Sequence, residues 1–202
     1  MKTYVSCPYR DGFEGKLYVP DQTVFQGKAL IVAGGGEGIY AVSKYIACQF
    51  ARMGIPALAL AYWNRPGLRD TFTNVPLETV RTAAEFLRNK GIRKIGMWGI
   101  SKGAEYALLC GSYFPELISA VVAVSPSCAC VQGFQFPNRN HLTARPLPGS
   151  AFSFEGRPLP YAPTRNVPRE VLRKSIQRKT FCSLPTYAES IDRATEKSRI
   201  PV

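Results

Sequence analysis

Apolar residues follow a strand-and-helix rhythm through the first 135 residues. Continuous apolar runs bounded by glycine or proline are typical of strands buried on both faces. They predict strands at residues 28–33, 56–62, 94–98 and 120–124, and residues 14–18 are a further short strand candidate. Apolar residues at helical spacing predict helices between them, at residues 39–53, 75–90 and 101–113. This alternation predicts an α/β fold with a mostly parallel sheet and right-handed crossovers.

The pattern changes after Phe136. Nine of the 16 prolines lie from Pro137 onward, and the apolar runs disappear. Residues 152–157 are a candidate hairpin arm, and residues 169–178 and 187–197 are candidate exposed helices. We therefore expect a single domain over residues 1–202, in which 137–199 form a Pro-rich, basic excursion over the active-site edge.

Composition and charge exclude several classes of protein. With 46% hydrophobic and 20% charged residues, the chain is expected to fold. The net charge is +12, and half of it lies from Arg145 onward, but no nucleic-acid-binding motif accompanies it. No apolar stretch reaches the roughly 18 residues of a spanning helix. The first residues carry no apolar signal core. We expect a cytoplasmic protein with no nucleic-acid partner and no membrane span.

Cysteine and histidine limit the chemistry further. Cys128 and Cys130 form a Cys-x-Cys pair without a second pair at zinc spacing, so we expect no metal and no cofactor. His141 is the single histidine, so any histidine-dependent step has one candidate within the sequence.

The most informative motif is Gly99-Ile100-Ser101-Lys102-Gly103, a Gly-x-Ser-x-Gly sequence between a predicted strand and a predicted helix. In that context the motif is typical of a nucleophile elbow, in which a tight turn lifts the serine hydroxyl above the sheet edge. The helix N-terminus beneath it favours developing negative charge. Ser101 is therefore the candidate nucleophile.

A second glycine-rich loop, Gly34-Gly35-Gly36-Glu37-Gly38, follows an earlier predicted strand. Backbone N–H groups of Gly35 and Gly36, with that of Lys102, are candidates for an oxyanion hole. The spacing matches neither a dinucleotide loop nor a Walker loop, although a plain structural turn stays open. Lys102 is expected to be solvated or salt-bridged, and Glu105 either pairs with it or faces inward.

These motifs resemble a known family: the catalytic domain shared by acyl-CoA thioesterases and bile acid-CoA:amino acid N-acyltransferases. The resemblance covers roughly residues 10–202 and rests on residues 99–105, 34–37, 60–64, 154–160 and 200–202. It implies an α/β-hydrolase fold that uses a serine or cysteine nucleophile, an acid and a histidine, in that order. It further implies Ser101 as nucleophile, oxyanion donors at Gly35, Gly36 and Lys102, and a small acyl thioester or ester as substrate.

The chain also departs from that family. The family's mammalian enzymes carry an N-terminal β-sandwich domain, and the Ile-Pro-Val sequence seen at 200–202 precedes the strands that bear the acid and the histidine. We therefore expect a sheet without those last strands, truncated at its C-terminus, whose exposed edge allows self-association. His141 has the wrong position in the chain for the triad base, and Asp192 lies on a predicted helix instead of at a strand end.

The sequence leaves three hypotheses. The first is acyl-CoA thioester hydrolysis, or acyl transfer to an amino acid, by Ser101. The second is an esterase, a dienelactone hydrolase or a peptidase-like enzyme on the same fold, because substrate choice depends on the pocket. The third is a catalytically inactive module, since no matching triad acid or histidine is recognisable and enzymatic activity is therefore uncertain.

Overall fold

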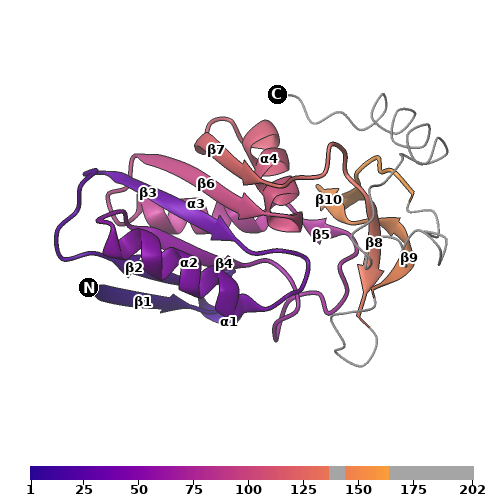
Figure 1. Ribbon diagram of the computed structural model, residues 1–202, viewed down its shortest axis with the longest axis horizontal. Coiled ribbons are helices and arrows are strands. Elements are labelled where there is room, and N and C mark those ends of the chain that lie inside the picture. The colour runs from indigo at the N-terminus through magenta and orange to yellow at the C-terminus, as the bar shows by residue number, and fades with distance from the viewer. Residues whose placement is uncertain (137–143, 164–202) are drawn as a thin grey trace, which may run out of the picture.

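A six-stranded sheet with helices on both faces forms the centre of the molecule (Figure 1). The computed structural model describes residues 1–136 and 144–163. The strand order is β1-β2-β4-β3-β6-β7, in which β2 runs antiparallel to both of its neighbours and the last four strands are parallel. The strands are β1 (Lys2–Ser6), β2 (Glu14–Val19), β3 (Lys28–Ala33), β4 (Ala57–Ala61), β6 (Lys94–Ile100) and β7 (Ile118–Val124). The mostly parallel sheet predicted from the apolar runs is confirmed.

Each face of the sheet has its own core. Helix α2 (Tyr40–Arg52) covers one face, and α3 (Thr79–Arg88) and α4 (Lys102–Tyr113) cover the other. Strand β4 shows why its sequence is continuously apolar: Ala57 and Ala59 pack in the α2 core, whereas Leu58 and Leu60 pack in the opposite core. Alternate side chains of a strand point to opposite faces, so a strand covered on both sides needs apolar residues throughout.

Two small sheets lie beyond the carboxyl ends of the parallel strands (Figure 1). One joins β5 (Val75–Pro76), β10 (Phe152–Phe154) and β11 (Arg157–Pro158), and the other pairs β8 (Gln132–Gln135) with β9 (Arg145–Ser150). The expected hairpin arm is present, with Glu155 and Gly156 both at positive φ in its two-residue turn. Phe152 is fully buried in the main core, so this arm contributes to the same domain.

Some local predictions differ from the structure. Residues 75 and 76 do not begin a helix but form β5, because Val75 pairs with Phe152 across the small sheet. Strand β1 and the short helix α1 (Pro8–Asp11) carry little buried apolar surface and have no clear sequence pattern. The two helices expected at 169–178 and 187–197 lie outside the described residues.

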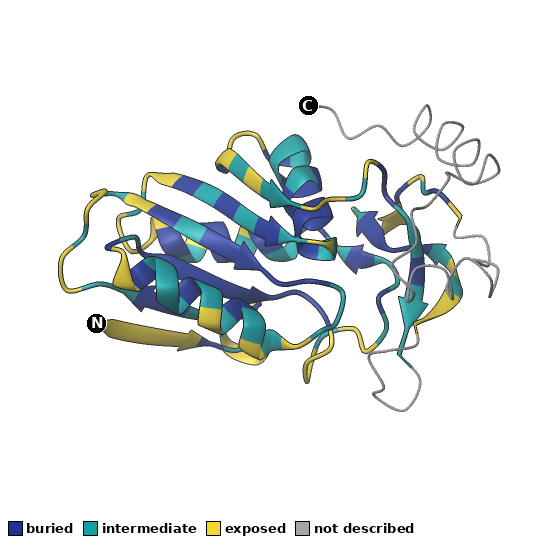
Figure 2. Ribbon diagram, viewed as in Figure 1, coloured by how far each residue is buried: buried dark blue, intermediate teal, exposed yellow. Residues whose placement is uncertain are grey.

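Strand β7 forms one edge of the large sheet and carries exposed residues (Figure 2). Val122 on it is 52% exposed. Within residues 1–136 and 144–163, no strand other than β6 pairs with it. Self-association through this edge stays a prediction. Among the described helices, none is both long and apolar enough to cross a bilayer.

Candidate active site

Ser101 occupies the turn between the end of β6 and the start of α4. Its backbone has φ 54° and ψ −119°, a conformation that residues with a Cβ rarely adopt. The Ser101 N–H donates to the Val124 carbonyl at 2.9 Å, and the Ser101 carbonyl accepts from Ala104 N–H at 3.0 Å. The turn is therefore held from both sides, and Ser101 is exposed at the carboxyl edge of the sheet.

The two glycines of the motif allow this turn to form. A methyl group on Gly99 would collide with the backbone of Gly103, and a methyl group on Gly103 would collide with the carbonyl groups of Ala33 and Gly34. The helix start therefore packs directly on the end of β3, at backbone-to-backbone distance. This is the physical reason for small residues two positions before and after the serine, as expected of a nucleophile elbow.

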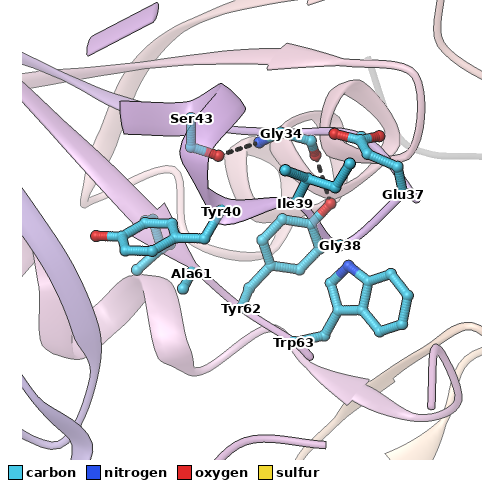
Figure 3. A pocket seen from close by; sticks show the side chains of 11 residues that line it. Gly34, Glu37, Gly38, Ile39, Tyr40, Ser43, Ala61, Tyr62 and Trp63 are labelled. Atoms are coloured by element: carbon cyan, nitrogen blue, oxygen red, sulfur yellow. Dashed lines mark hydrogen bonds between the residues drawn. The ribbon is translucent and has the colours of Figure 1, made fainter. Parts of the chain in front are cut away.

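The loop that follows β3 is fixed through Gly34 (Figure 3). Ser43 Oγ accepts the Gly34 N–H at 2.9 Å, and Tyr62 donates its hydroxyl to the Gly34 carbonyl at 2.6 Å. Both side chains come from elements of the core, α2 and the end of β4. The Gly34 N–H is therefore occupied, so a donor to an oxyanion has to come from the residues that follow it in the loop.

Gly36 lies beside the elbow. A methyl group built on it would lie 2.8 Å from Lys102 Cγ and 2.9 Å from Phe134 Cζ. Within the described part of the chain, the N–H groups of Gly35, Gly36 and Lys102 donate to no other residue. The structure thus brings the glycine loop and the residue after Ser101 together, although they lie more than 60 positions apart in sequence.

The side chain of Lys102 turns toward Glu105. Its Nζ lies 2.7 Å from Glu105 Oε2 and 3.4 Å from Ser127 Oγ. Glu105 is fully buried, and its other oxygen accepts the Val131 N–H at 3.1 Å. Both alternatives considered for Glu105 therefore hold: it pairs with Lys102 and it faces inward. The pair ties the first turn of α4 to the segment that follows β7.

We expect Glu105→Leu to lower the free energy of unfolding by about 3 kcal/mol, because it leaves a largely buried ammonium and the Val131 N–H without their acceptor. Glu105→Gln keeps an acceptor for Val131 and is expected to cost less. Urea unfolding followed by circular dichroism measures both changes. The double variant Lys102→Met, Glu105→Leu removes both charges and serves as the control. A loss below about 1 kcal/mol for Glu105→Leu, or no recovery in the double variant, would contradict this account.

Aromatic side chains fill the space under the glycine loop. Tyr62 stacks on Tyr106 with ring centroids 4.5 Å apart, and Trp63 meets Phe72 edge-on at 4.9 Å. Phe134 stacks on Phe72 at 4.8 Å. A cavity of about 10 Å³, room for roughly one water molecule, lies between Gly34, Tyr62 and Trp63 (Figure 3). Trp63 Nε1 is buried there without a hydrogen-bond partner among the described residues.

Burial raises the pKa of two groups near the site, Tyr62 and Cys130. Burial raises the pKa of Tyr62 well above its usual value, and the carboxylates of Glu37 and Glu105 act in the same direction. Burial likewise raises the pKa of Cys130 to about 11, although its contact with Ser150 lowers it in part. Tyr62 therefore stays a neutral donor and Cys130 a neutral thiol at pH 7.

Sequence reasoning found Ser101 and the glycine loop but missed their supports. Ser43 and Tyr62, which fix Gly34, carry no motif that would single them out, although Tyr62 lies within the segment 60–64 that bears the family resemblance. His141 and Asp192 lie outside the described residues. No cluster of three metal-ligating side chains occurs among the residues that the structure describes.

Known proteins match this chain in sequence. The rat mitochondrial acyl-coenzyme A thioesterase 2 is 32% identical over 128 residues, covering 61% of this chain and 27% of the relative. Human acyl-coenzyme A thioesterase 1 is 32% identical over 130 residues, covering 62% of this chain and 30% of the relative. The chain thus spans under a third of the length of these curated relatives.

Solved structures match the fold. ESTFA in its FE-lacking apo form superposes with a TM-score of 0.50 at 18% identity, covering 64% of this chain and 46% of that one. The α/β hydrolase GrgF from Penicillium has a TM-score of 0.48 at 21% identity, with coverages of 59% and 43%. The strand order of the large sheet, the turn at Ser101 and the superposition on ESTFA together give the α/β-hydrolase fold expected from the sequence.

A family model gives the most specific match. The model for the C-terminal region of BAAT and acyl-CoA thioester hydrolases matches residues 75–192, more than half of the chain. This range contains the elbow at Ser101, the Lys102–Glu105 pair and strands β6 and β7. The chain belongs to the BAAT/acyl-CoA thioester hydrolase C-terminal family.

Proposed function

We propose that this chain carries the nucleophile and the oxyanion hole of an enzyme that cleaves acyl-CoA thioesters, with release of the acyl group to water or to an amino acid. The observation that carries the proposal is the backbone of Ser101, with φ 54° in a turn clamped between Gly99 and Gly103. Such strain persists only where the surrounding structure enforces it, and it is concentrated at functional sites.

In the proposed reaction, Ser101 Oγ attacks the thioester carbonyl carbon while a general base takes its proton. The carbonyl oxygen becomes an oxyanion, which accepts hydrogen bonds from N–H groups of Gly35, Gly36 and Lys102. The carbon–sulfur bond then breaks, the CoA sulfur takes up the proton, and an acyl-serine forms. Attack by water or by an amine on this ester releases the acyl group and restores the serine.

Lys102 has a separate role in this proposal. Its ammonium lies 2.7 Å from Glu105 Oε2 and is neutralised by that carboxylate, so we do not assign it to binding the substrate. The side chain therefore anchors the first turn of α4, and its backbone N–H is the part that serves the reaction. The base and the acid of the triad are assigned to no described residue. The cytoplasmic compartment stays a prediction from the sequence.

The test is covalent labelling of the folded chain with a fluorophosphonate probe, followed by peptide mass spectrometry. We expect the phosphonate on the peptide that contains Ser101, with slower labelling in the presence of an acyl-CoA than of a simple ester. The same assay on any longer form of the protein shows whether further sequence raises the rate. Labelling that is absent in both forms, or confined to another serine, would overturn the assignment.

A further inference from the structure

The amino ends of the parallel strands form a second surface, at the far end of the sheet from Ser101. In Figure 1 this is the end where β3 and β6 begin and where the loop between β2 and β3 lies. The end of α2 reaches the same surface, because the Val24 N–H of that loop donates to the Gly54 carbonyl at 2.9 Å. Loop, helix end and strand starts therefore form one continuous face.

Large apolar side chains are exposed on this face. Val24 and Met53 are each 66% exposed, and Phe25 is 47% exposed (Figure 2 shows the exposed loop). Val24 and Met53 line the same open hollow, of about 670 Å³. Exposed apolar groups that cluster in this way, rather than being scattered singly, mark interaction sites.

Cations surround these apolar residues. Lys28 at the start of β3 is paired in register with Lys94 at the start of β6, and the Gly27 carbonyl accepts from the N–H groups of both Arg93 and Lys94. Lys28 Nζ lies 5.3 Å from the ring centroid of Phe25. Arg52 lines the same hollow as Val24 and Met53, and Lys90 lines a neighbouring hollow with Gly27. We define the amino-end face by its apolar and cationic residues: Val24, Phe25, Lys28, Arg52, Met53, Lys90, Arg93 and Lys94.

The acidic side chains that the structure describes do not neutralise the positive charge of the amino-end face. In the part of the chain that the structure describes, none of its five cations forms an ion pair. Asp21, an acidic residue that lines the same hollow as Val24, is paired with the Met1 amino group at 2.6 Å. Like charges held side by side across two strands are unfavourable unless an anionic partner covers them.

We propose that the amino-end face docks on a lipid bilayer that contains anionic headgroups. Val24, Phe25 and Met53 enter the boundary between headgroups and acyl chains, while the surrounding cations contact the headgroup charges. A bilayer fits better than a nucleic acid, because the apolar side chains at the centre of the face have no role against a phosphate backbone. The docked orientation leaves the Ser101 edge on the side away from the membrane.

The experiment is co-sedimentation of the 202-residue chain with vesicles of phosphatidylcholine alone or with about 30% phosphatidylserine, at low and high salt. We expect binding to the anionic vesicles only, and a loss of most of it at high salt, because surface charges are screened. Lys28→Glu with Lys94→Glu is expected to lower the partition coefficient at least about tenfold. Val24→Ser with Phe25→Ser is expected to lower it at least about fivefold.

Arg69→Glu with Arg157→Glu is the matched control, since both residues are exposed, lie away from this face and change the net charge by the same amount. Circular dichroism verifies that each variant is folded, and the salt dependence of the unmodified chain tests the charge contribution without any variant. No binding to anionic vesicles, or an equal loss in the control, would overturn the proposal. So would binding that is insensitive to Val24 and Phe25 but displaced by a DNA oligonucleotide, which would indicate a general polyanion site.

Discussion

Ser101→Ala is expected to lower kcat/KM for acyl-CoA hydrolysis by a factor of about 10⁴ or more, and to abolish labelling by the fluorophosphonate probe. The hydroxyl is the group that forms the acyl-enzyme in the proposed mechanism, and an oxyanion hole without a nucleophile leaves only a small residual rate. The measurement is steady-state hydrolysis of a series of acyl-CoAs, in the longest form of the protein that shows activity.

Two other variants make this result specific. Ser125→Ala is the matched control, because Ser125 follows the neighbouring strand β7 and also has a positive φ, of 50°; its activity is expected to change by less than about twofold. Ser101→Gly is expected to be as inactive as the alanine variant but more stable by about 1 kcal/mol or more, since glycine relieves the backbone strain. Full activity of Ser101→Ala would exclude the proposed nucleophile.

Gly103→Ala is expected to lower the free energy of unfolding by about 3 kcal/mol or more, or to prevent folding. The added methyl group would overlap the backbone carbonyls of Ala33 and Gly34, which lie at the buried end of β3 and have no free direction in which to move. Urea unfolding measures the loss directly, and probe labelling reports the elbow geometry in any fraction that still folds.

Gly111→Ala on the same helix is the control for helix propensity and substitution type. Its methyl group would meet Val121 Cγ2 at 2.7 Å, the end of a partly buried side chain at the sheet edge that can move. We expect a change within about 1 kcal/mol. If both variants behave alike, the backbone contact between α4 and β3 is not what makes Gly103 necessary.

The sequence predicted most accurately those strands and helices whose residue pattern has a single structural explanation. Residues 29–33 are continuously apolar because they lie in β3, which is covered on both faces, and the predicted bounds 28–33 match the structure. Strand β9 was missed because Pro146 and Pro148 are typical of loops. Proline is tolerated here because β9 is an edge strand of a two-stranded sheet, so a proline can take a position whose N–H would not point at the partner strand. Strand β1 was missed because four of its five residues are exposed and give no apolar signal.

The candidate site likewise has one part that the sequence predicts and another that it does not. The motif around Ser101 is local, so five consecutive residues determine the turn and identify the nucleophile candidate. The positions of Gly36 beside Lys102, and of Val131 beside Glu105, are contacts between distant segments. No periodicity or spacing encodes them, because they arise only when β3, β6 and β7 align at one sheet edge.

By itself, the sequence determined the parallel α/β core, the strand-to-helix turn at Ser101 and the glycine loop, because apolar periodicity and glycine placement act over short stretches of chain. Only the tertiary structure decided that Glu105 is buried with Lys102, that Ser43 and Tyr62 occupy the two polar groups of Gly34, and that Val75 belongs to a small sheet with Phe152. The physical reason is that burial and hydrogen-bond partners depend on which segments pack together, and packing is a property of the whole fold.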